Sequence, residues 1–135
     1  MQSAADETVS SIIEKWSAGF NRLDADALSS LYSRNAFFFG SKSQLYRGNA
    51  GVAAYFNALP RWSSPTVQFT DRTTAQVNSD LINFAATASF VVDEDTAPLS
   101  VKITWVIARE DGDWKIVSHH VSSRTPLLSD EPSAS

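Results

Sequence analysis

The chain has no cysteine among its 135 residues. It therefore has no disulfide, no thiolate metal ligand and no thiol nucleophile. It has two histidines, His119 and His120, which are adjacent. Because successive residues of a strand point to opposite faces of the sheet, their imidazoles would bind one metal ion only if a bulge intervened. We therefore expect no metal site.

Long apolar runs and basic clusters are also missing. No segment approaches the roughly 20 apolar residues of a membrane span. The net charge is −4 without any Lys/Arg cluster, which excludes the usual footprint of a nucleic-acid-binding protein. The first residues, MQSAADETVSS, have neither the basic start nor the apolar stretch of a signal peptide. We expect a cytoplasmic protein that binds neither nucleic acid nor membrane.

The motifs of several common chemistries are missing as well. The chain has no nucleophile elbow, no phosphate-binding loop and no paired carboxylates at catalytic spacing. Asp6, Asp24, Asp111 and Asp113 are explained as helix caps or turn residues. We expect no cofactor.

The composition is that of one globular domain. Apolar residues make up 43% of the chain and charged residues 19%. We expect a single domain over residues 1–126, followed by a small, polar and disordered tail over 127–135.

Apolar periodicity and turn residues predict the order ααββαββββ. The expected elements are a helix that starts at Asp6, a short helix capped by Asp24 and carrying Tyr32, strands over 36–39 and 45–47, a helix capped by Asn49 and ended by Pro60, and strands over 66–77, 81–92 and on both sides of Asp111-Gly112. This order indicates an α+β fold, with three helices packed on a strongly curved antiparallel sheet.

The closing segment, 99–126, carries the strongest local signal. Asp111-Gly112 lies between two alternating apolar runs, which is typical of a two-residue hairpin turn. Counting outward from the turn pairs Trp105 with Ser118 and Ile103 with His120 on one face. That face is apolar with isolated polar groups, as expected of a pocket wall.

This order and these residues resemble the nuclear transport factor 2-like superfamily, the cone-shaped fold of ketosteroid isomerases and polyketide cyclases. Three segments carry the resemblance: FNRLDADALSSLYSRNA at 20–36, YRGNAGVAAYF at 46–56 and TWVIAREDGDWKIVSHHVSSRTP at 104–126. The last segment is similar to the branch that includes kinase association (hub) domains and uncharacterised polyketide cyclase-like bacterial proteins. The resemblance implies a cone with an internal pocket, and a homodimer formed through the outer face of the sheet.

The resemblance also implies which functional residues are replaced. The tyrosine and aspartate of the steroid isomerases fall on Trp16 and Gly40, and glycine cannot act as a base. The arginine that helps hub domains bind small carboxylates falls on Trp105, whereas their strand-end histidine falls on His120. Arg47, Arg61 and Arg72 are possible substitutes for the lost cation.

His120 is the leading candidate for a catalytic group, because histidine titrates near neutral pH. The expected lining of the pocket is Trp16, Tyr32, Tyr55, Ile103, Trp105, Ser118 and His120. For the aromatic residues, ordinary core packing is an alternative explanation. For His120, the alternative is a core or interface histidine.

Three functions remain open. The first is a domain that binds a small hydrophobic or aromatic ligand in an apolar pocket and acts as a homodimer. The second is a lyase, isomerase or cyclase that acts on a small hydrophobic substrate, with His120 as general base and Tyr32 or Trp16 as donor. The third is an assembly module that oligomerises partners, although no attached domain accompanies it in this chain.

Overall fold

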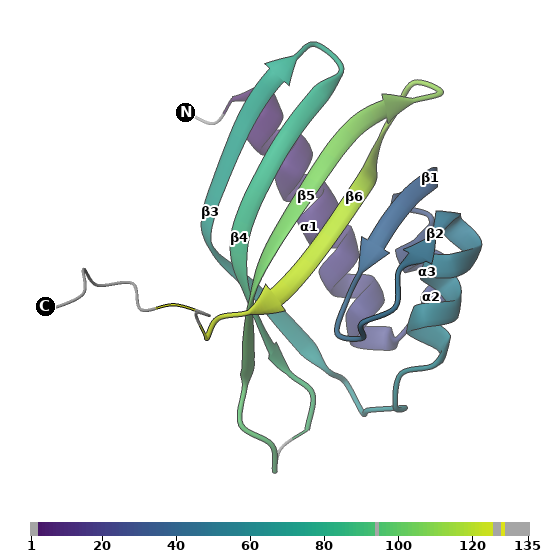
Figure 1. Ribbon diagram of the computed structural model, residues 1–135, viewed down its shortest axis with the longest axis vertical. Coiled ribbons are helices and arrows are strands. Elements are labelled where there is room, and N and C mark those ends of the chain that lie inside the picture. Colours follow the sequence, from purple (N-terminus) through teal and green to yellow (C-terminus); the bar gives the residue numbers. More distant parts are fainter. Residues whose placement is uncertain (1–2, 94, 126–127, 129–135) are drawn as a thin grey trace, which may run out of the picture.

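The computed structural model describes residues 3–93, 95–125 and 128. Its element order is ααββαββββ, as predicted, in an α+β fold (Figure 1). The helices are α1 (Ala4–Arg22), α2 (Ala25–Ser29) and α3 (Gly48–Asn57), and the strands are β1 (Tyr32–Phe39), β2 (Tyr46–Arg47), β3 (Thr66–Asn78), β4 (Leu81–Val91), β5 (Leu99–Glu110) and β6 (Asp113–Ser123). The tail expected over 127–135 lies outside the described residues, apart from Leu128.

The strands form one curved sheet in the order β2-β1-β6-β5-β4-β3. Neighbouring strands are antiparallel except for β1 and β6, which are parallel. Figure 1 shows α1 crossing behind the long strands, while α2 and α3 lie beside β1 and β2. The core therefore lies between the concave face of the sheet and the helices. Within the described residues, no helix is long and apolar enough to cross a membrane.

Helix α1 begins earlier than the sequence predicts. Ser3, not Asp6, is the N-cap residue, and the two side chains form a capping box: the Ser3 hydroxyl accepts from the Asp6 N–H at 3.1 Å. The apolar stripe is as expected, with Val9, Ile12 and Trp16 buried against the sheet. The helix ends at Arg22, and the C-cap residue Leu23 has a left-handed backbone and donates its N–H to the carbonyls of Gly19 and Phe20.

Tyr32 was expected on the second helix but is the first residue of β1. The Ile116 N–H donates to the Leu31 carbonyl at 2.9 Å, so the chain joins β6 here and the helix cannot continue. Asn49 was expected to cap α3, but Arg47 is the N-cap residue. The Asn49 amide instead donates to the carbonyls of Ser29 and Tyr32, at 2.8 and 2.6 Å, and ties α3 to the start of β1.

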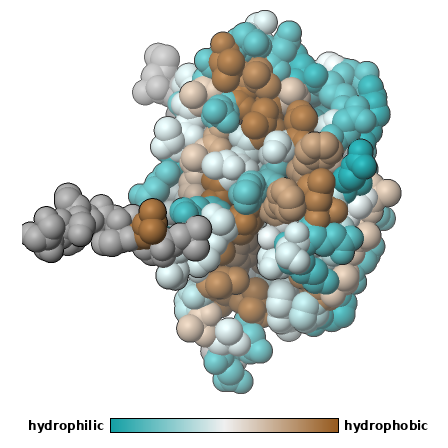
Figure 2. All heavy atoms as spheres, in the orientation of Figure 1, coloured by the Kyte–Doolittle hydropathy of each residue, from teal (hydrophilic) through white to brown (hydrophobic). Residues whose placement is uncertain are grey.

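Among the described residues, no helix covers the convex face of the sheet (Figure 1). Figure 2 shows apolar side chains gathered among polar ones on this side of the molecule. In β1, Phe37 and Phe39 are 50% and 38% exposed. The next strand places the exposed His120 beside Phe39, with ring centroids 5.5 Å apart.

Candidate functional site

The β5–β6 hairpin begins in the predicted register and then changes it. Arg109 pairs with Trp114 and Ile107 with Ile116, as counted from the Asp111-Gly112 turn. A β-bulge follows at Val117, which inserts one extra residue into β6.

Beyond the bulge, every expected pair is displaced by one residue. Trp105 pairs with His119 rather than Ser118, and Ile103 pairs with Val121 rather than His120. A shift of one residue exchanges the two faces of a strand, so His119 faces the core and His120 faces outward. His119 is 3% exposed, whereas His120 belongs to the exposed class. The expected place of His120 in the pocket wall is therefore wrong.

His119 stands at the centre of a buried chain of hydrogen bonds. The Trp16 Nε1–H donates to Tyr32 Oη at 2.9 Å, and Tyr32 Oη lies 2.9 Å from His119 Nδ1. The Trp105 Nε1–H also donates to Nδ1, at 2.9 Å. An indole N–H can only donate, so Nδ1 must be an unprotonated acceptor and the Tyr32 hydroxyl must direct its own proton to it. These bonds join α1, β1, β5 and β6.

The same bonds determine the tautomer of His119. With Nδ1 accepting, the proton of the neutral ring is on Nε2. Among the residues that the structure describes, Nε2 has no hydrogen-bond partner. Every fully buried side-chain nitrogen or oxygen in this part of the chain has one, so Nε2 is not fully buried. The Nε2 atom is therefore open to the space in front of the ring.

Burial keeps this ring neutral. Desolvation, helped by the neighbouring His120, lowers the pKa of His119 to about 3. Phe38 covers one face of the imidazole in a stacked arrangement, with centroids 4.0 Å apart. Burial also raises the pKa of Tyr32 well above its ordinary value, so the hydroxyl keeps its proton. At neutral pH the network holds no charge.

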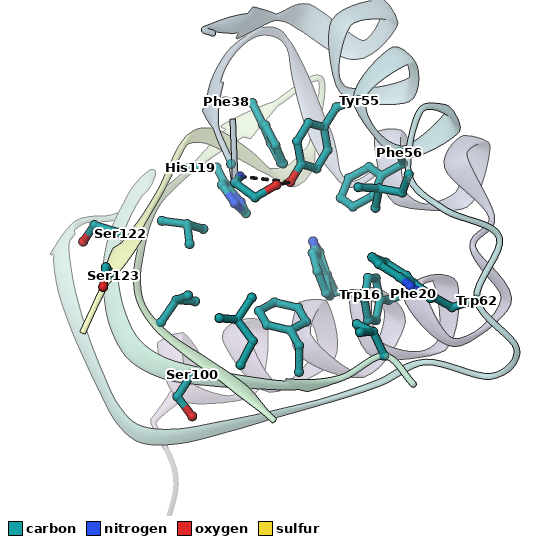
Figure 3. Close-up of a pocket in the computed structure, with 18 residues that line it drawn as sticks. Trp16, Phe20, Phe38, Tyr55, Phe56, Trp62, Ser100, His119, Ser122 and Ser123 are labelled. Carbon is teal, nitrogen blue, oxygen red and sulfur yellow. Dashed lines mark hydrogen bonds between the residues drawn. The ribbon is translucent and has the colours of Figure 1, made fainter. Parts of the chain in front are cut away.

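A cavity of about 340 Å³ lies in front of His119 (Figure 3). Its wall combines aromatic and aliphatic side chains from α1, α3 and the concave face of the sheet, with a few serines. The lining residues are Trp16, Phe20, Phe38, Gly40, Ser41, Tyr55, Phe56, Leu59, Trp62, Phe90, Val92, Leu99, Ser100, Val101, His119, Val121, Ser122 and Ser123. None of these residues is Asp, Glu, Lys or Arg.

A second polar group lies on the wall near His119. Tyr55 Oη accepts from the Ser41 N–H at 3.0 Å and shares a hydrogen bond of 2.6 Å with Ser41 Oγ. Figure 3 shows Tyr55 beside His119, whereas the hydroxyls of Ser100 and Ser122 point away from the middle of the cavity. The polar groups available to a molecule in the cavity are thus concentrated around His119 and Tyr55.

Gly40 lies next to this pair, and the neighbouring rings leave no room for a side chain at this position. A Cβ at position 40 would be 2.7 Å from Tyr55 Cζ and 2.7 Å from Phe38 Cε1. Both positions that correspond to isomerase residues, Trp16 and Gly40, therefore reach the cavity wall. Neither supplies a base.

The structure separates the seven expected pocket residues into three groups. Trp16 and Tyr55 line the cavity. Tyr32, Trp105 and Ile103 are buried but lie outside the lining, the first two as partners of His119. Ser118 and His120 lie on the outer face, because of the bulge.

The sequence prediction missed His119 and the Phe38 ring that stacks on it. Phe38 was expected in a strand, but residues 36–39 read AFFF and are apolar throughout, so no alternation in the sequence separates the inward-facing Phe38 from the exposed Phe37 and Phe39.

The arginines considered as substitute cations are engaged away from the cavity. Arg47 lies over the Phe37 ring, 5.8 Å from its centroid. Arg61 donates to the Phe56 and Leu59 carbonyls, and Arg72 donates to the Ser10 hydroxyl. Within the described residues, no group of three or more histidine and carboxylate side chains could hold a metal ion.

Solved structures share this fold at low sequence identity. A Xanthomonas campestris protein named for the calcium/calmodulin-dependent protein kinase II association domain has a TM-score of 0.81 and 19% identity, over 94% of this chain and 91% of that one. A nuclear transport factor 2-like protein of unknown function from Pseudomonas putida has a TM-score of 0.79 and 16% identity, over 98% and 99%. The hexachlorocyclohexane dehydrochlorinase LinA-type3 of Novosphingobium barchaimii has a TM-score of 0.73 and 17% identity, over 90% and 88%.

Curated protein sequences give no match to this chain. A family match covers nearly all of the domain: residues 9–126 match the SnoaL-like domain. With the curved sheet and three helices described above, this match shows that the chain belongs to the SnoaL-like domain family, within the nuclear transport factor 2-like superfamily.

Proposed function

We propose that this domain binds a small, uncharged and largely apolar molecule in the cavity in front of His119. The observation that carries the proposal is the chemistry of the wall. Eighteen residues line about 340 Å³, and none of them carries a full charge at neutral pH, because the pKa of His119 is lowered to about 3. Known ligand pockets have volumes of roughly 300–1,000 Å³ and few polar groups, so this cavity suits a small ligand.

The wall also favours a flat, apolar molecule. Trp16 packs against Phe20 and Phe56, with ring centroids 5.3 and 5.8 Å away, so the cavity has a rigid aromatic side. Aromatic surfaces gain most from ring contacts at offset or edge-on geometry. A carboxylate would have no cation to pair with in the wall, and burying it unpaired is costly.

The proposal can be tested with a neutral hydrophobic fluorophore, N-phenyl-1-naphthylamine. We expect saturable binding to the purified protein at one site. Val121→Phe adds bulk to the wall and should weaken this binding about tenfold or more, because overpacking costs about 1–3 kcal/mol and ~1.4 kcal/mol is tenfold.

Val77→Phe is the matched control, since Val77 is 55% exposed near the end of β3 and is not in the cavity wall. It should leave the affinity unchanged. Absence of saturable binding to the wild-type protein would refute the proposal, as would equal affinities of the two variants.

An enzyme mechanism with His120 as general base does not fit the structure. His120 is exposed on the convex face, beside Phe39, and is absent from the cavity wall. His119, which does line the cavity, has an Nε2–H that can donate a hydrogen bond but cannot accept a proton. The dehydrochlorinase likeness shows a shared fold and adds no residue to this argument.

A further inference from the structure

The two nitrogens of His119 have opposite roles. Nδ1 receives the Trp105 N–H and the Tyr32 hydroxyl, both at 2.9 Å, so its lone pair is fully used inside the core. Nε2 carries the proton and is open to the cavity. Two donors on Nδ1 draw electron density from the ring, which makes Nε2–H a stronger donor.

Resting on the proposed function, we propose that the ligand carries an uncharged carbonyl-type oxygen and that this oxygen accepts a hydrogen bond from His119 Nε2–H. The proposal narrows the ligand class from apolar molecules in general to ketones, quinones, lactones and related neutral acceptors. It also assigns a specificity role to His119, whereas the family resemblance pointed to the adjacent His120.

The orientation of the donor is fixed by packing on several sides. Phe38 stacks on the imidazole with an interplanar angle of 18°, and the Trp105 and Tyr32 bonds hold the Nδ1 edge. A pre-oriented donor in an apolar wall favours a matching acceptor, because its hydrogen bond is made without ordering flexible groups. A ligand without an acceptor leaves Nε2–H desolvated and unpaired, which costs binding energy.

Other polar ligands fit less well. A cation would meet the positive end of the Nε2–H dipole, and an anion would lack a counter-charge among the lining residues. A molecule with only donor groups could bind the Tyr55 and Ser41 oxygens but would leave His119 unpaired. A neutral acceptor satisfies the wall without introducing charge.

The test compares 1-tetralone with tetralin, which has the same two rings but a CH₂ in place of the carbonyl. Each is titrated against bound N-phenyl-1-naphthylamine, which reports cavity binding independently of a carbonyl. The informative variant is His119→Asn: its side-chain oxygen can replace Nδ1 as acceptor for Trp105 and Tyr32, while its shorter amide nitrogen falls short of the former Nε2 position. We expect His119→Asn to lower the affinity for 1-tetralone about tenfold and to change the affinity for tetralin less than about twofold.

His119→Gln is the complementary variant, because its amide N–H can approach the former Nε2 position. It should retain part of the preference for 1-tetralone. Equal weakening of both compounds by His119→Asn would overturn the inference while leaving the proposed function intact, and so would failure of 1-tetralone to displace the fluorophore. Failure of the fluorophore itself to bind would instead refute the proposed function.

A measurement on the wild-type protein does not depend on the folding of any variant. The ¹⁵N chemical shifts of His119 should show a pyridine-type Nδ1 and a protonated, pyrrole-type Nε2, unchanged between about pH 5 and 8. Adding 1-tetralone should shift Nε2–H and leave Nδ1 nearly unaffected, whereas tetralin should not. A proton on Nδ1, or a response to both compounds alike, would contradict the assignment.

Discussion

At the scale of single residues, His119 combines structural and binding roles in one ring. Its Nδ1 closes a hydrogen-bond chain between four elements, and its Nε2 is the polar atom exposed to the cavity. Because the ring is buried at 3% exposure, its protonation would disrupt the core and the site together. The pH dependence of stability should therefore report on this residue.

The folded protein should lose stability as the pH falls from about 6.5 toward 3. The pKa of His119 is lowered to about 3, against about 6.5 in an unfolded chain. In this window the unfolded state binds a proton that the folded state does not, so stability rises with pH by up to about 1.4 kcal/mol per pH unit. Urea unfolding at a series of pH values between about 4 and 8 measures this slope.

His119→Asn removes the titrating group and should flatten the curve between about pH 5 and 6.5. His120→Asn is the matched control on the adjacent, exposed residue and should keep most of the slope. The burial argument fails if wild type and His119→Asn show parallel curves.

At the scale of elements, regular patterns were predictable and interruptions were not. Asp111-Gly112 specified the turn, and the register was correct as far as Ile116. The bulge at Val117 had no signal, because Ile116-Val117-Ser118 reads as ordinary strand sequence. One inserted residue then exchanged His119 and His120 between the two faces, and the site prediction failed with it.

Tyr32 illustrates a second limit of local sequence patterns. With Leu28 and Leu31 it matches helical spacing, but pairing with β6 decides its conformation. Such long-range pairing is absent from a local window. Trp16 and Tyr55, in contrast, lie on well-formed helices, and both line the cavity.

Helix α1 offers a direct test of its capping box. Ser3→Ala removes the hydroxyl that accepts from the Asp6 N–H, and we expect a loss of about 1 kcal/mol in unfolding free energy. Thermal or urea unfolding measures the loss. Ser43→Ala, in the exposed loop after β1, should change stability by less than about 0.5 kcal/mol; equal effects of the two substitutions would contradict the role of the cap.

At the scale of the whole molecule, the sheet has one covered and one uncovered face. The concave face holds the cavity and the core, while Phe37 and Phe39, which flank the inward-facing Phe38 in β1, are exposed on the convex face. We propose that a second copy of the chain covers this convex face, as the superfamily resemblance implies. Apolar residues that line up on an uncovered face are typical of a protein interface.

Sedimentation velocity tests the dimer directly. The sedimenting species of the wild type should have twice the 14.8 kDa mass of one chain. Phe37→Glu places a charge in the apolar patch and should raise the dissociation constant of the dimer tenfold or more. This corresponds to a loss of association free energy on the order of 1.4 kcal/mol. Ala18→Glu makes the same charge change on the exposed side of α1 and should remain dimeric. A monomeric wild type would refute the proposal.

The crowding around Gly40 has a consequence for how this domain can change. An acidic side chain at position 40 would collide with Tyr55 and Phe38, whose ring atoms lie 2.7 Å from the place of its Cβ. A catalytic carboxylate there would consequently require at least two coordinated replacements, one to introduce the acid and one to make room for it. The changes are therefore strongly epistatic, and an engineered proton-abstracting descendant should be sought among variants that combine an acid at position 40 with smaller side chains at positions 38 and 55.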